Sequence, residues 1–264
     1  MNRFLLSSVF ISSLTFAYSD FVPLRERAQA HSLTGALQAN ESVYSNPAGA
    51  TFYNTYTVEG TYAFPRSFSA SVIDTKTTSV GAGLGYFKNQ DLETQQSQQG
   101  FRLNLGTRLT ENLGVALAGK AIWNNRPGQT SQSKDADAGL LWKYGFSSAG
   151  LVIRNILGGS DINQRRELSL GGRLGYENTL FVSASMHSEF SRLSPYEVGI
   201  GAEYISPWHF ALMGGYRFET ENEASYWSTG VSFFSPRMSL HYAIEFPQQP
   251  NESSNHLLGL SLEM

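Results

Sequence analysis

The chain has 264 residues, a formal net charge of −3 and no cysteine. Charged residues make up 16%, against roughly 25% in a typical soluble domain, and aromatic residues make up 13%. This composition excludes a disulfide framework, a thiolate metal site and a cysteine nucleophile, and the nearly neutral charge gives no reason to expect nucleic acid as a partner.

The first 19 residues, MNRFLLSSVFISSLTFAYS, have the pattern of a secretory signal peptide. Arg3 supplies the positive start, and the apolar stretch 4–16 is shorter than the ~20 residues that a membrane-spanning helix needs. Ala17 and Ser19 are the small residues of a cleavage site. We therefore expect residues 1–19 to direct the chain out of the cytoplasm; the alternative is a buried N-terminal helix.

From residue 54 onward, apolar and polar residues alternate with period two, which predicts β-strands. The sequence contains fourteen such segments, near 54–64, 67–74, 78–87, 100–109, 113–123, 135–144, 148–155, 166–176, 179–187, 196–204, 208–218, 226–234, 238–246 and 256–264. A soluble β-sandwich also alternates in this way, so the connections have to decide between the two.

The connections favour a membrane barrel. With one early exception, tight turns alternate with longer polar segments, 124–134 among them. A barrel built of hairpins produces this pattern when both mature termini lie on its periplasmic side. One strand face is apolar, as bilayer lipid requires, and the other carries charges that a dry sandwich core could not hold. We expect these charges to line a wet lumen: Glu59, Arg102, Arg108, Lys120, Lys143, Arg173, Glu203, Arg217 and Glu245.

Residues 20–53 do not alternate. The stretch from Arg25 to Ala39 suits a short helix. Further on, Asn46 is placed to cap a helical turn that Pro47 can begin, and Gly49 allows the chain to turn into the first strand. Many predicted inward positions in the barrel are glycine, which leaves room inside. We therefore predict that residues 20–53 form a helical hatch inside the barrel of residues 54–264, and that Asn46, Pro47, Ala48 and Gly49 form its gating turn.

The stretch Arg25-Glu26-Arg27-Ala28 … Gly35-Ala36-Leu37-Gln38-Ala39-Asn40-Glu41-Ser42-Val43-Tyr44-Ser45-Asn46-Pro47-Ala48-Gly49 resembles the N-terminal hatch of the FadL/PorV superfamily of outer-membrane barrels. The resemblance implies a fourteen-stranded antiparallel, up-and-down transmembrane β-barrel in the outer membrane of a Gram-negative envelope. It also implies insertion by the barrel-assembly machinery, to which the alternation of Leu258, Leu260 and Leu262 is suited.

We find no catalytic, metal or cofactor site in the sequence. His187, Ser188 and Glu189 are adjacent, but neighbouring residues of a strand point to opposite faces. Asp135 and Asp137 could bind a cation, and polar lining of the lumen is the simpler interpretation. The sequence thus predicts a non-enzymatic, porin-like channel for passive transport of small molecules, hydrophobic ones among them. The alternative is a docking protein, a PorV-like partner of a secretion or envelope machine.

Overall fold

The computed structural model describes residues 21–36, 39–64, 67–90, 96–158, 165–191, 194–221, 223–248 and 253–264. The predicted signal peptide lies outside these residues. In the described part, fourteen strands form the wall: β1 (Tyr56–Ala63), β2 (Ser67–Asp74), β3 (Gly81–Gln90), β4 (Ser97–Arg108), β5 (Leu113–Arg126), β6 (Gln129–Tyr144), β7 (Ser147–Arg154), β8 (Glu167–Tyr176), β9 (Leu180–Glu189), β10 (Pro195–Ser206), β11 (Phe210–Glu219), β12 (Ala224–Ser235), β13 (Met238–Pro247) and β14 (Asn255–Glu263). Three short helices precede them: α1 (Leu24–Ala28), η1 (Asn40–Val43) and η2 (Pro47–Phe52).

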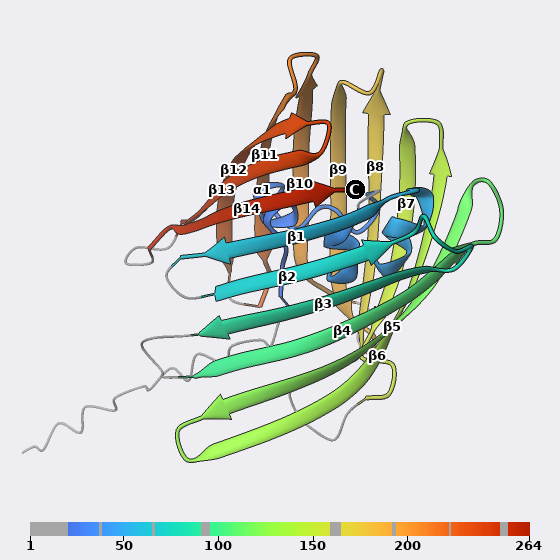
Figure 1. Ribbon diagram of the computed structural model, residues 1–264. Coiled ribbons are helices and arrows are strands. Elements are labelled where there is room, and N and C mark those ends of the chain that lie inside the picture. Colours follow the sequence, from blue (N-terminus) through green and yellow to red (C-terminus); the bar gives the residue numbers. More distant parts are fainter. Residues whose placement is uncertain are drawn as a thin grey trace, which may run out of the picture.

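The strands close into one antiparallel barrel in which every strand pairs with its neighbours in the chain (Figure 1). The ring is closed by β1 and β14, which pair from Thr57 opposite Glu263 to Ala63 opposite Leu257. Closure satisfies the backbone groups that an open sheet edge would leave unpaired in lipid. The predicted all-β, up-and-down barrel of fourteen strands is therefore confirmed. Within the described residues, no helix is long and apolar enough to cross a membrane.

The two ends of the barrel differ in their connections. At the end where Met264 donates its N–H to the Tyr56 carbonyl, strands are joined by residues 75–80, 109–112, 145–146, 177–179, 207–209 and 236–237. At the other end, the connections are residues 64–66, 91–96, 127–128, 155–166, 190–194, 220–223 and 248–254. The longest connection, 155–166, belongs to the second set. We refer to these as the short-turn end and the long-loop end.

The outer surface of the barrel is apolar and carries aromatic rings near both ends. Leu103, Leu117 and Leu174 point outward from the strands and are at least half exposed. Towards the long-loop end, four rings on the neighbouring strands β2 to β5 form a continuous row, with centroids 5.5, 4.8 and 6.1 Å apart: Phe68, Tyr86, Phe101 and Trp123. Towards the short-turn end lie Trp142, Tyr144, Tyr176 and Trp208, all exposed. Such rings favour the head-group level of a bilayer.

Two sequence predictions were wrong in detail. Residues 124–134 do not form a loop, because β5 and β6 continue as a hairpin that turns at residues 127–128. Backbone pairing between two strands needs no apolar face, so the polar residues there extend the strands beyond the aromatic row. The helix expected over 25–39 is limited to α1, because Ala30 and His31 have left-handed backbone angles (φ 54° and 59°) that end it.

Candidate functional site

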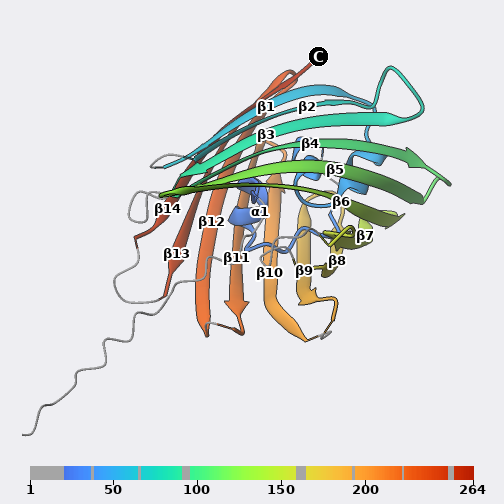
Figure 2. The ribbon, with the colours of Figure 1, turned by 90° about the horizontal axis from the view of Figure 1, so that it is seen from below.

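The lumen of the barrel is filled by the hatch, which we define as residues 21–53 (Figure 2). Its first segment, residues 21–36, carries α1, which packs against β11 to β14 through Leu24 and Ala28. Its second segment, residues 39–53, carries η1 and η2, and η2 packs against β4, β5 and β6. The hatch therefore crosses the lumen from one wall to the opposite one.

Glycines on the inner wall let the hatch backbone lie directly against the strands. A Cβ atom at Gly199 would collide with the Ala30 carbonyl oxygen, and one at Gly215 would lie 2.7 Å from the Gln29 carbonyl carbon. At Gly139 it would meet Pro47 at 2.8 Å. Gly100 and Gly175 differ, because a Cβ atom at Gly100 would meet Phe87 of the wall and one at Gly175 would meet Phe181, and neither would meet the hatch. The wall thus leaves a space at this level that its own side chains do not fill.

Asn46 joins both hatch segments to the wall. Its Oδ1 accepts the Ala48 N–H at 3.0 Å and caps η2, which begins at Pro47. Its Nδ2 donates to the Thr34 carbonyl of the first segment at 2.9 Å and to the Leu140 carbonyl of β6 at 3.2 Å. The predicted gating residues Asn46, Pro47, Ala48 and Gly49 are all buried and form one turn of the hatch. This turn is the point at which the two segments and the barrel meet.

The second segment is held through its backbone carbonyls by basic side chains of the wall. Arg102 on β4 donates to the carbonyls of Val43 (3.2 Å) and Tyr44 (2.8 Å). Arg154 on β7 donates to the carbonyls of Tyr44 (3.2 Å) and Ser45 (3.0 Å). These carbonyls lie at the end of η1, where helical hydrogen bonding leaves acceptors free. The wall thus completes the hydrogen bonding of η1.

Asp137 on β6 forms ion pairs with two basic side chains of this wall. It lies 2.8 Å from Nη2 of Arg102 and 3.0 Å from Nζ of Lys120. Asp135, two residues earlier, accepts the backbone N–H of Leu157 at 3.0 Å. The two aspartates considered as a cation site are therefore engaged with the protein itself, and no group of three metal-ligating side chains occurs among the described residues.

The first segment is held through its cations by carboxylates of the opposite wall. Arg25 lies 2.5 Å from Glu203, which also contacts Arg173 at 2.6 Å and is fully buried. Arg27 lies 3.4 Å from Glu245, which also contacts Arg217 at 2.9 Å. Because both carboxylates are almost fully buried, solvent and salt screen these pairs less than they screen ion pairs on the surface. These ion pairs therefore hold the first segment in place.

The other predicted lumen charges also lie on the inner face. Glu59 accepts a hydrogen bond from Ser261 at 3.0 Å. Arg108 donates to the Thr51 carbonyl at 2.9 Å, with its guanidinium 5.2 Å from the centre of the Phe52 ring. Lys143 lies on the inward side of β6 near the short-turn end.

Four residues of this network were missing from the predicted site: Arg25, Arg27, Arg154 and Glu197. The alternation of β10 places Glu197 on the same face as Glu203, so the pattern already carried that signal. No local sequence pattern indicates the roles of Arg25 and Arg27, because their ion-pair partners are about 180 or more residues away in the chain.

His187 pairs with Ser169 on the neighbouring strand, at 2.8 Å, and not with Ser188. A second serine–histidine pair has the same arrangement: Ser232 on β12 lies directly opposite His241 on β13, and their side chains are 2.7 Å apart. The recurrence of this cross-strand pair fits a structural role. The His31 carbonyl of the hatch covers His187 at 3.3 Å.

Glu41 in η1 is a buried carboxyl whose protonation we expect to favour the seated hatch. Its Oε1 accepts the Arg25 N–H at 2.6 Å, and its Oε2 is buried without a hydrogen-bond partner in the described part of the chain. Burial raises the pKa of this carboxyl from 4.5 to about 8, against the attraction of Arg25 and with a contribution from Glu59. A raised pKa means that the seated hatch binds the Glu41 proton more tightly than the unfolded chain does.

We expect the contribution of Glu41 to stability to be complete below its ordinary pKa of 4.5 and to be lost as the pH rises through about 8. The check is the thermal midpoint of the detergent-solubilised protein across this range, compared with a Glu41→Gln variant that cannot titrate. The wild-type midpoint should fall relative to that of the variant. Parallel curves would contradict the assignment.

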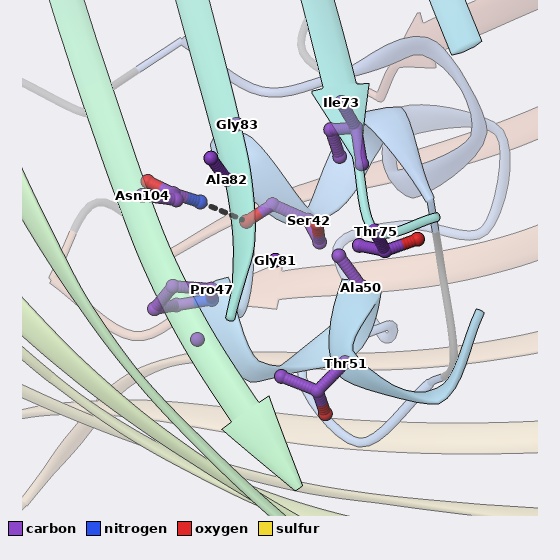
Figure 3. Close-up of a pocket in the computed structure, with 11 residues that line it drawn as sticks. Ser42, Pro47, Ala50, Thr51, Ile73, Thr75, Gly81, Ala82, Gly83 and Asn104 are labelled. Carbon is purple, nitrogen blue, oxygen red and sulfur yellow. Dashed lines mark hydrogen bonds between the residues drawn. The ribbon is translucent and has the colours of Figure 1, made fainter. Parts of the chain in front are cut away.

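The hatch borders a small cavity on the side of β2, β3 and β4. This cavity of about 10 Å³, room for about one water molecule, lies between η1, η2 and strands β2, β3 and β4 (Figure 3). Asn104, which lines this cavity, donates a hydrogen bond from Nδ2 to the Ser42 carbonyl at 3.2 Å. This cavity is too small to hold a solute larger than water.

No family model matches the chain, and no curated protein matches its sequence. Solved structures do match its fold. The P. putida toluene transporter TodX has a TM-score of 0.69 and 11% identity, covering 93% of this chain and 98% of its own. The CymD monoaromatic hydrocarbon channel has a TM-score of 0.67 and 12% identity, covering 92% and 96%. A Pseudomonas aeruginosa FadL homologue has a TM-score of 0.60 and 12% identity, covering 93% and 99%.

Proposed function

We propose that this chain, which has the fold of the FadL-like outer-membrane barrels, is a passive channel for small molecules in the outer membrane and that its hatch closes it. One observation carries the proposal: the lumen is filled by a separate N-terminal segment and not by side chains of the wall. A barrel whose only task is structural has no need of a wall of glycines at this level. Displacement of the hatch would leave a lumen lined by small and charged side chains.

The two hatch segments differ in how they are attached. The second segment continues directly into β1, and it is held by Arg102 and Arg154. The first segment is held to the wall by side chains, chiefly the ion pairs of Arg25 and Arg27. We therefore assign opening to withdrawal of the first segment, with Asn46 as the contact that has to break between the segments.

An apolar recess beside the first segment supports hydrophobic solutes among those that pass. The Phe21 ring lies 5.0 Å from that of Tyr44 and 6.0 Å from that of Phe87. Val43, Ile73 and Ile122 complete this buried cluster. Withdrawal of Phe21 would leave a space suited to another aromatic ring. The names of the TodX and CymD structures, a toluene transporter and a monoaromatic hydrocarbon channel, agree with this proposal.

The apolar outer surface of the barrel is the basis for the partners that we propose. Outer-membrane lipid contacts the apolar band, and the barrel-assembly machinery inserts the barrel, for which the outward Leu258, Leu260 and Leu262 of β14 provide an apolar face. We propose that the short-turn end, where the C-terminus lies, faces the periplasm.

The test is solute flux into proteoliposomes containing the full chain. Asn46→Ala removes the hydrogen bonds to the carbonyls of Thr34 and Leu140, at a cost of about 1–3 kcal/mol, and should raise the flux of a small sugar about tenfold. The matched control is Asn112→Ala, an exposed asparagine in the 109–112 turn, which should leave the flux unchanged. Equal and negligible flux in all three proteins would overturn the proposal.

The alternative, a docking protein for a secretion or envelope machine, is supported by the modest length of the connections at the long-loop end. It predicts a stable partner that co-purifies with the wild type, and no flux even after the hatch is loosened. The same experiment therefore separates the two functions.

A further inference from the structure

The inner wall of the barrel is divided by charge. Among the described inward-facing residues of β4 to β7, basic side chains predominate: Arg102, Arg108, Lys120, Arg126, Lys143 and Arg154, against Asp135 and Asp137. On β8 to β13 the balance is reversed: Glu167, Glu189, Glu197, Glu203, Glu219 and Glu245, against Arg173 and Arg217. We call the second surface the acidic wall. The hatch lies between the two surfaces.

Each of three basic side chains of the first segment contacts a different carboxylate of the acidic wall. Arg25 meets Glu203 and Arg27 meets Glu245. Nδ1 of His31 lies 2.8 Å from Glu197. The second segment presents backbone carbonyls to the basic wall instead. The orientation of the hatch thus follows the charge division of the lumen.

Withdrawal of the first segment would remove Arg25 and Arg27 but leave the basic groups of the acidic wall in place. Arg173 is held over the Phe181 ring at 3.9 Å, and Arg217 over the Tyr226 ring at 4.0 Å. Arg217 also keeps Glu197 at 3.1 Å and Glu219 at 2.8 Å. The uncovered surface would therefore carry six carboxylates and two guanidinium groups among its described residues. A narrow passage lined by an excess of one charge concentrates ions of the opposite sign.

We infer that the passage opened by withdrawal of the first segment selects cationic over anionic solutes, and that Glu203 and Glu245 determine this selectivity. The inference rests on the proposed function and adds a class of preferred solute to it. In the closed state, the guanidinium groups of Arg25 and Arg27 occupy the positions that a permeating organic cation would take. Phe21 of the first segment packs against Phe87 and Tyr44, so withdrawal of this segment would uncover the apolar recess as well as the acidic wall, and a cation that carries an aromatic ring matches both surfaces.

The experiment is the reversal potential of the full-length protein in a planar bilayer under a KCl gradient. Arg25→Gln/Arg27→Gln releases the first segment while leaving the acidic wall intact. We expect this variant to conduct with K⁺ preferred over Cl⁻ by about tenfold, the lower bound for enrichment of counter-ions in a charged cleft. Adding Glu203→Gln/Glu245→Gln halves the excess of negative charge on the acidic wall, from four to two, and should lower the K⁺ preference to about threefold. Adding Glu111→Gln/Glu177→Gln, two exposed turn carboxylates, is the control that should keep it.

The possible outcomes distinguish a failure of the inferred cation selectivity from a failure of the proposed channel function. Conductance with an anion preference, or with a cation preference that Glu203→Gln/Glu245→Gln leaves unchanged, would overturn the inference and leave the channel function standing. No conductance in any variant, Asn46→Ala included, would overturn both. Should the arginine variant fail to assemble, Gly199→Leu obstructs the seat of the first segment from the wall side, with every charge unchanged, and the same measurement applies.

Discussion

A leucine at Gly199 is expected to unseat the first hatch segment while the barrel still forms. The Cα of Gly199 faces the Ala30 carbonyl so closely that even a Cβ atom would overlap it. The new side chain would point into the lumen, and it would leave the hydrogen bonds of β10 with β9 and β11 unchanged. The strain therefore falls on the hatch, which is the more weakly attached of the two partners.

Because the chain contains no cysteine, a single Ala30→Cys substitution reports on this seating. Ala30 is 1% exposed, so a maleimide reagent should modify it slowly in the closed protein. With Gly199→Leu added, the labelling rate should rise by about 5-fold to 150-fold, since overpacking of this kind costs roughly 1–3 kcal/mol.

The matched control is Gly119→Leu on β5, where an added Cβ meets nothing within 4 Å. It should leave the labelling of Ala30→Cys as slow as before. If Gly199→Leu also leaves the rate unchanged in a folded barrel, the first segment does not occupy the position described above.

Placing an arginine at Leu103 is expected to lower the stability of the inserted barrel by about 2–4 kcal/mol, the cost of this side chain near the middle of a lipid-facing strand. Leu103 lies in the middle of β4, points outward and is 51% exposed. The measurement is reversible unfolding by urea in lipid vesicles, with the folded fraction read from the heat-dependent shift in gel mobility.

The comparison for this prediction is Tyr144→Arg, at the end of β6, in the proposed head-group region. Its cost should be no more than about 1 kcal/mol, because the penalty falls towards the interface. Equal effects at the two positions would show that the outward face of β4 does not lie in hydrocarbon.

The strand pattern could be predicted because the barrel has to satisfy two solvents at once. Lipid requires Leu103 and Leu105 outside, and a polar lumen accepts Arg102 and Asn104 between them, so the period of two is visible in the sequence. The hairpin over 124–134 escaped prediction because both of its faces are polar. The backbone of these residues pairs as a hairpin, but their side chains show no alternation of apolar and polar residues in the sequence.

The hatch was predictable as a plug but not in its shape. Ala30 and His31 end the helix with left-handed backbone angles that neither residue favours, and contact with the wall at Gly199 and Gly215 accompanies this turn. The pairing of Arg25 with Glu203 likewise depends on how deep the hatch sits. Nothing in a local pattern encodes that depth, because it is set by contacts between residues far apart in the chain.

The seam between β1 and β14 fixes the order in which the molecule can be completed. The ring is completed by pairing between β1 and β14, the first and last strands of the barrel, so it cannot close before both are in place. The hatch precedes all fourteen strands in the chain and leads straight into the first of them. The hatch can therefore take its place before the ring closes, and it does not have to enter a finished cylinder from outside.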